Sequence, residues 1–162
     1  MDLREIFGLW CLATYAVNAW AAAHAKPRFA DAVGVSVMFC MAYALSNTLV
    51  EVYGFPAGVM LWPVIDLVLL GMVARSWYKE RSWWKPVISA LLVFQLISHV
   101  AFFHVLQVGE ATQHSIYVYA VMMNVAFGLQ LVTMGSVGIS HALAVAFSGL
   151  LDRWRLYRVG HG

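Results

Sequence analysis

The chain has 162 residues, of which 62% are hydrophobic and 11% are charged. A soluble domain is about half apolar and about a quarter charged, so this composition excludes an ordinary water-soluble fold and predicts an integral membrane protein solvated by the lipid bilayer. The net charge of +2 is too small to indicate a nucleic-acid partner, and Cys11 and Cys40 match no disulfide framework, zinc site or redox CxxC motif.

Five stretches are long and apolar enough to cross a bilayer, which takes about 20 predominantly apolar residues. In chain order they cover residues 6–23, 32–53, 56–77, 86–106 and 115–137. None alternates polar and apolar residues as a barrel strand does, so we expect one domain, an all-α polytopic helix bundle with five transmembrane helices. The segment "AAAHAK" resembles a signal-peptidase site, but "MDLREI" before it lacks a basic cluster, so the first stretch is expected to stay as a membrane helix.

The segment over residues 140–157 differs from the five spans. Apolar residues recur at helical spacing on one of its faces: Leu143, Phe147, Leu150 and Trp154. With polar residues on another face, this pattern predicts a C-terminal amphipathic interfacial helix, which either lies along the membrane surface or extends the fifth span past it. Gly135 and Gly138 precede the segment and could allow a bend.

Basic residues orient the predicted bundle, since cytoplasmic loops are enriched in Lys and Arg. The first and third connections and the C-terminal tail hold nine basic residues, whereas the opposite side holds only Arg4. We therefore expect the N-terminus outside and the C-terminus in the cytoplasm, in a bacterial inner membrane. Nine residues carry this assignment: Lys26, Arg28, Arg75, Lys79, Arg81, Lys85, Arg153, Arg155 and Arg158.

Polar and small residues follow one face of the second span, at steps of three and four: Ser36, Cys40, Tyr43, Asn47 and Glu51. This spacing predicts that the face points into protein or water and not into lipid. Other spans carry shorter stripes: Cys11, Tyr15 and Asn18; Gln95 and His99; Tyr117, Asn124 and Gly128. For Asn18, Gln95, Asn124 and Gln130 we favour interhelical hydrogen bonds, which stabilise membrane bundles by about 0.6 to 2 kcal/mol each.

Asp66 lies near the middle of the third span, where an acid costs a few kcal/mol and usually faces a cavity or a partner. Pro63 removes a backbone donor beside it and bends the helix. A proton or ion site explains this arrangement, and so does a protonated Asp66 bonded to a neighbouring helix. With Asn47, Glu51 and His99, it forms a predicted outer-half cluster for protons, cations or a small polar solute.

Histidines on different helices could hold a b-type haem between them. His99 with His114 would form an outer pair, and His24 with His141 an inner pair. Two haems would fill much of so small a bundle, so we favour ordinary hydrogen bonds for these histidines. The sequence leaves cofactors and metals unassigned.

Transport or conduction is the favoured function, performed by a homo-oligomer because five spans enclose little space alone. Two alternatives stay open. One is an accessory or anchor subunit of a larger membrane complex, with the polar stripes binding partner helices, haem or a quinone-like cofactor. The other is a phage-type membrane-permeabilising protein. An enzyme has the least support, because the chain has no phosphate-binding glycine loop, GxSxG or HExxH motif.

Overall fold

The computed structural model describes residues 3–25 and 30–159, and the side chains of most of them. The described chain folds into five α-helices and no strand: α1 (Leu3–Ala25), α2 (Ala30–Tyr53), α3 (Phe55–Lys79), α4 (Trp84–Gln107) and α5 (Gln113–Val159). All five are long and apolar enough to cross a membrane. The predicted all-α membrane bundle with five spans is therefore confirmed.

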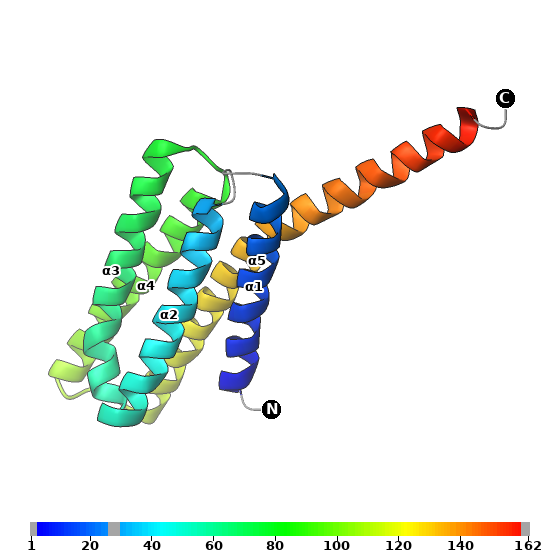
Figure 1. The fold of residues 1–162 in the computed structure, drawn as a ribbon. Helices are drawn as coiled ribbons and strands as arrows, with labels where there is room; N and C mark the ends of the chain where they lie inside the picture. Colours follow the sequence, from blue (N-terminus) through cyan, green and yellow to red (C-terminus); the bar gives the residue numbers. More distant parts are fainter. Residues whose placement is uncertain (1–2, 26–29, 160–162) are drawn as a thin grey trace.

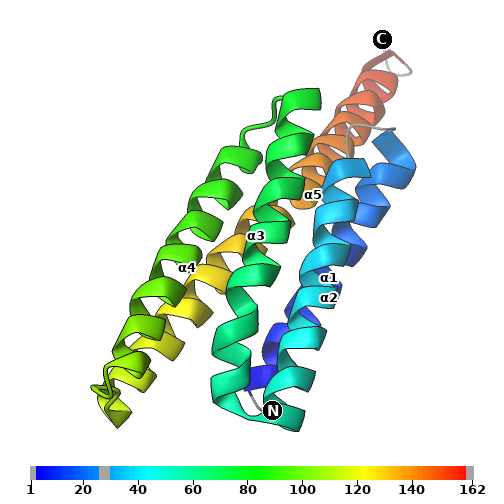
Figure 2. The ribbon, with the colours of Figure 1, turned by 90° about the vertical axis from the view of Figure 1, so that its left-hand side faces the viewer.

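The five helices close a ring. Each helix packs against the next along the chain, and α5 returns to pack against α1 (Figures 1 and 2). The N-terminus lies at the end of the bundle that carries the α2–α3 turn, and α5 leaves the bundle at the opposite end (Figure 1). We call these the α2–α3 end and the α3–α4 end.

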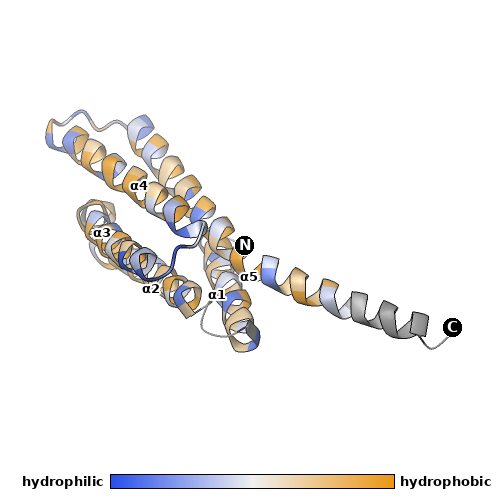
Figure 3. Cartoon of the chain, turned by 90° about the horizontal axis from the view of Figure 1, so that it is seen from above, coloured by the Kyte–Doolittle hydropathy of each residue, from blue (hydrophilic) through white to orange (hydrophobic). Residues whose placement is uncertain are grey.

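The outward surface of the ring is apolar. Large aliphatic side chains from every helix are more than half exposed, among them Leu12, Met41, Leu67, Ile97 and Val132. Figure 3 shows apolar residues on all sides of the helices, with polar residues gathered near their ends and at the α3–α4 connection. A surface of this kind is stable against lipid, where helices also satisfy their own backbone hydrogen bonds.

One residue joins α2 to α3. Gly54 has φ 80°, in the left-handed region that favours glycine, and its N–H donates to the Val50 carbonyl at 3.0 Å. The two helices consequently run antiparallel, so residues near the end of α2 lie beside residues near the start of α3.

The fifth span and the amphipathic segment form one continuous helix, because α5 runs unbroken from Gln113 to Val159. Gly135 and Gly138 do not end the helix, although it changes direction where it leaves the bundle (Figure 1). The prediction of an extended fifth span is thus confirmed, and the separate interfacial helix is not formed. The structure does not describe the side chains of several residues used above to predict the orientation and the amphipathic segment: Lys26, Arg28, Leu150, Arg153, Trp154, Arg155 and Arg158.

The half of the bundle toward the α3–α4 end is solid. Its core holds ten buried apolar residues: Ala32, Val35, Phe39, Leu69, Val73, Trp84, Ile88, Leu92, Met134 and Val137. Beside it, the buried Asn18 amide donates to Ser36 Oγ at 2.9 Å and to the Met134 carbonyl at 3.1 Å. These bonds tie α1 to α2 and α5, as expected for Asn18.

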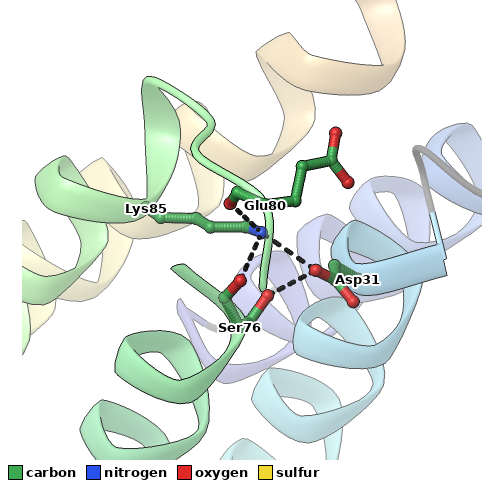
Figure 4. A network of polar contacts seen from close by, with 4 residues as sticks. All are labelled: Asp31, Ser76, Glu80 and Lys85. Atoms are coloured by element: carbon green, nitrogen blue, oxygen red, sulfur yellow. Dashed lines mark hydrogen bonds and ion pairs between the residues drawn. The ribbon is translucent and has the colours of Figure 1, made fainter. Parts of the chain in front are cut away.

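Lys85 is buried at this end of the bundle and forms an ion pair with Asp31 (Figure 4). Its side chain is 1% exposed, and Nζ donates to Asp31 Oδ2 at 2.9 Å and to the carbonyls of Ser76 and Glu80 at 3.1 and 2.8 Å. The Ser76 hydroxyl donates to the same Asp31 oxygen. From the sequence, Lys85 was predicted to be one of the loop charges that set the orientation. In the structure it is buried and joins α2, α3 and α4 through its hydrogen bonds.

Candidate functional site

A partly open cavity of about 390 Å³ occupies the half of the bundle toward the α2–α3 end, and all five helices contribute to its wall. Seven aromatic side chains form much of the wall: Phe7, Phe39, Tyr43, Phe55, Trp62, Tyr119 and Phe127. Between them lie polar side chains: Ser46, Asn47, Asp66, Gln95, His99, Asn124 and Gln130. An apolar cavity with a few convergent polar groups is the usual form of a small-molecule site.

Two of these polar side chains form a buried hydrogen-bonded chain with Tyr119, one of the aromatic residues. Nε2 of His99 lies 3.0 Å from Oδ2 of Asp66, and Nδ1 of His99 is hydrogen-bonded to the Tyr119 hydroxyl. In a neutral imidazole protonated at Nε2, the Nε2–H donates to Asp66 and the Tyr119 hydroxyl donates to Nδ1. Side chains from α3, α4 and α5 are thereby linked in one relay.

The pattern of α4 explains why His99 points inward. From Lys85 on, its buried residues recur every three or four positions along one face: Trp84, Lys85, Ile88, Leu92, Gln95, His99 and Phe102. His99 therefore shares the core-facing side of α4 with aliphatic residues. The neighbouring helix α3 supplies Asp66, whose hydrogen bond with the imidazole lowers the free-energy cost of burying it.

The predicted outer-half cluster is only partly assembled. The structure brings Asn47, Asp66 and His99 to the wall of one cavity. Glu51, near the end of α2, is exposed and is not among the lining residues. The functional role of all four residues stays a prediction, and the cavity wall includes only the first three.

The residues that were predicted to join helices also fall into two groups: those that form a buried bond between helices, and one that is exposed at the cavity wall. Gln130 donates through Nε2 to Gln95 Oε1, so α4 and α5 are joined by a buried bond at the inner end of the cavity. Asn124 is exposed and contributes to the cavity wall. Gln95 and Gln130 thus both connect helices and offer polar atoms to a solute.

Sequence reasoning missed Tyr119 and the aromatic wall. On α5 it selected Tyr117, which is exposed, whereas Tyr119 is buried. A usable signal was present, because Tyr119 and Gln130 lie about three helical turns apart and so share one face. On α1, similarly, Tyr15 is exposed and the neighbouring Thr14 is buried.

The indole N–H of Trp62 is buried and has no hydrogen-bond partner among the described residues. The Trp62 ring packs against Phe55 and His99, with centroids 5.7 and 6.0 Å away. Since Trp62 lines the cavity, a water molecule or a polar atom of a bound solute can accept this hydrogen bond.

The histidine pairs do not fit a haem. Both ring nitrogens of His99 are already hydrogen-bonded, and His114 is exposed at the start of α5. At the other end, the Trp20 ring packs against both His24 and His141, with centroids 4.5 and 6.4 Å away. Within the described part of the chain, no group of three or more His, Cys, Asp or Glu is placed to hold a metal ion.

Comparison with protein-family models, with curated proteins and with solved structures found no match to this chain. Its function is therefore argued from the geometry of the cavity.

Proposed function

We propose that the chain is a proton-linked carrier of a small solute, with the cavity as the solute site and Asp66, His99 and Tyr119 as the proton-handling group. The observation that carries this proposal is the buried hydrogen-bonded chain in the cavity wall. Ionisable residues inside membrane spans are costly, and they typically mark proton or ion pathways.

The solid half of the bundle supports a carrier over an open pore. The cavity ends where Gln95 bonds to Gln130, and the packed core lies beyond them. A pore would need a continuous passage through this core. A solute held in the cavity can instead cross when the helices rearrange around it, as in alternating access.

The relay can hold an added proton without leaving a net buried charge. Protonation of His99 produces an imidazolium next to the Asp66 carboxylate, and the opposite charge stabilises it. Tyr119 then accepts a hydrogen bond from Nδ1–H. The titratable groups packed around His99 are Asp66 from α3 and Tyr119 from α5, and Tyr43 of α2 lines the same cavity.

The charges at the ends of the helices support a location in a bacterial inner membrane. Three exposed basic residues, Arg75, Lys79 and Arg81, gather at the α3–α4 end. By the positive-inside rule, this end faces the cytoplasm and the cavity lies toward the outer side.

Proton flux into proteoliposomes tests the proposal. Wild-type protein is expected to admit protons when a membrane potential is imposed, and a pH-sensitive dye inside the vesicles reports the flux. Asp66→Asn removes the charge that stabilises the His99 imidazolium while keeping the size of the side chain. We expect it to lower the flux by more than about tenfold.

Glu110→Gln is the matched control, because it makes the same acid-to-amide change at an exposed residue between α4 and α5. It is expected to retain wild-type flux. Tyr119→Phe removes only the hydroxyl of the relay and is expected to slow the flux while the protein keeps its helical circular dichroism spectrum. Normal flux in Asp66→Asn would refute the proposal.

A further inference from the structure

We propose that the cavity binds an organic cation, a compact ammonium-type group carried on an aromatic or alkyl body. This inference names the solute of the proposed carrier and rests on that function for its transport consequence, although binding can be measured without transport. Three features of the wall support it: its charge, its aromatic rings and its unused hydrogen-bond donor.

The charge of the wall favours a cation. Among the described residues that line the cavity, Asp66 is the only acid, and neither Lys nor Arg is present. A neutral His99 donates to one carboxylate oxygen and leaves the negative charge in largely apolar surroundings. An entering cation gains Coulombic attraction there, whereas an anion is repelled.

Aromatic rings surround the space next to that charge. The Trp62 ring lies 6.0 Å from the His99 ring that bonds to Asp66. Across the cavity wall, Tyr43 of α2 and Phe127 of α5 stack with their centroids 5.7 Å apart. Cations are attracted to the faces of such rings, to Trp most strongly, and aromatic cages are the usual recognition sites for quaternary ammonium groups.

A bare metal ion fits this wall poorly. Hard cations take several oxygen ligands, and a single carboxylate already bonded to His99 does not supply them. A cavity of about 390 Å³ with aromatic walls is better filled by an organic body. A hydroxyl or ether oxygen on that body can accept the hydrogen bond of the Trp62 indole.

The cation and the proton compete for the same carboxylate. When His99 is protonated, its imidazolium neutralises Asp66, and the solute loses its charged partner. Tyr119 faces the same imidazole, and Tyr43 is the remaining titratable side chain among the described lining residues. The proton and the organic cation are therefore expected to compete, so that protonation of His99 weakens binding of the cation.

Two probes of equal shape test this inference. Phenyltrimethylammonium and its uncharged isostere tert-butylbenzene are titrated into the purified full chain, and tryptophan fluorescence reports binding. Because the probes differ in charge, the ratio of their dissociation constants isolates the electrostatic contribution. We expect the wild type to bind the cation at least about tenfold more tightly. In Asp66→Asn we expect this preference to fall below about threefold, while Glu110→Gln keeps it.

Equal affinities for the two probes in the wild type would overturn the inference, and so would an equal loss of preference in Glu110→Gln. Trp62→Leu keeps Asp66 intact and is expected to weaken cation binding by about fivefold, so unchanged affinity in that variant would contradict the aromatic cage. Cation binding without proton flux would refute the carrier and leave this inference standing. Proton flux without a preference for the cation would refute this inference and leave the carrier standing.

Discussion

At the scale of single residues, Lys85 shows how this fold accommodates a charge inside an apolar bundle. Its ammonium group has three donors, and each finds an oxygen: one from Asp31, one from Ser76 and one from Glu80. Its side chain is buried, whereas that of Asp31 is about one third exposed. Loss of either partner would leave the other without its opposite charge, and the larger cost falls on the more deeply buried Lys85.

Lys85→Met is therefore expected to lower the free energy of unfolding by about 3 kcal/mol, because Asp31 and two carbonyls lose their donor. The double variant with Asp31→Asn should lose less than the sum of the two single losses, since the residues interact directly. Denaturation in micelles, followed by circular dichroism, measures these differences. Lys79→Met is the control, because Lys79 is exposed in the same region. Equal stability of the Lys85 and Lys79 variants would contradict the assignment.

The sequence was sufficient to single out some residues of the cavity wall, but not the side chains that contact them. Asp66 and His99 stood out because polar groups in apolar spans are costly, and both line the cavity. Glu51 followed the same helical periodicity but is exposed and does not line the cavity, although the neighbouring Val50 does. Tyr119 and Trp62 were missed because aromatic residues are common in membrane spans, where a ring that faces the core and a ring that faces lipid look alike in the sequence.

At the scale of the helices, α1 and α5 approach each other closely at Gly138. A Cβ atom placed there would lie 2.4 Å from Val17 Cγ1 and 2.9 Å from the Val17 backbone carbonyl carbon. At Gly135, three residues earlier, the nearest atom is Thr14 Oγ1 at 3.7 Å, an ordinary contact. Small residues of this kind allow membrane helices to pack with their backbones close together.

Gly138→Ala is expected to destabilise the protein by about 1 to 3 kcal/mol, since α1 and α5 must separate to admit the methyl group. Gly135→Ala is the matched substitution on the same helix and is expected to change stability by less than about 0.5 kcal/mol. The same denaturation assay compares them. Equal effects at the two positions would show that α1 does not pack against Gly138 as described.

The packing of α1 against α2 can be tested through its thiols. Cys11 and Cys40 share no sequence motif, yet their thiols lie close together across these helices. Mild oxidation with diamide is expected to join them in an intramolecular disulfide, so that a maleimide mass tag no longer labels the denatured monomer. In Cys40→Ser, Cys11 is expected to stay available to the tag. Full labelling of the oxidised wild type would contradict this packing.

At the scale of the whole molecule, the existence of five helices followed from apolar stretches that are each long enough to cross the hydrocarbon core of a bilayer. The closure of the ring and its hollow half could not be predicted in the same way. They depend on how each helix is rotated about its axis, and an apolar span facing lipid on one side and core on the other shows little contrast between the two. The hydropathy pattern also could not decide whether α5 is one continuous helix, because a change from apolar to amphipathic residues does not by itself end a helix.

An odd number of spans places the two termini on opposite sides of the membrane. A green fluorescent protein fused to the C-terminus is expected to fluoresce, because it folds in the cytoplasm. Alkaline phosphatase fused to the C-terminus in place of the fluorescent protein is expected to be inactive, because it forms its disulfides only after export from the cytoplasm. A dark fluorescent-protein fusion together with an active phosphatase fusion would place the C-terminus outside. That result would contradict the orientation assigned from the basic residues.

The division of the bundle into a hollow half and a solid half also determines where a transmembrane voltage acts. Solvent in the cavity conducts the potential of the side to which it opens, so the electric field concentrates across the dry, packed layer beyond Gln95 and Gln130. A unit charge crossing the full field gains about 2.3 kcal/mol per 100 mV. We therefore expect protons to reach Asp66 and His99 from the cavity almost independently of voltage. Their release to the opposite side, when the helices rearrange, would cross nearly the whole potential, so the cell's own voltage would drive that step.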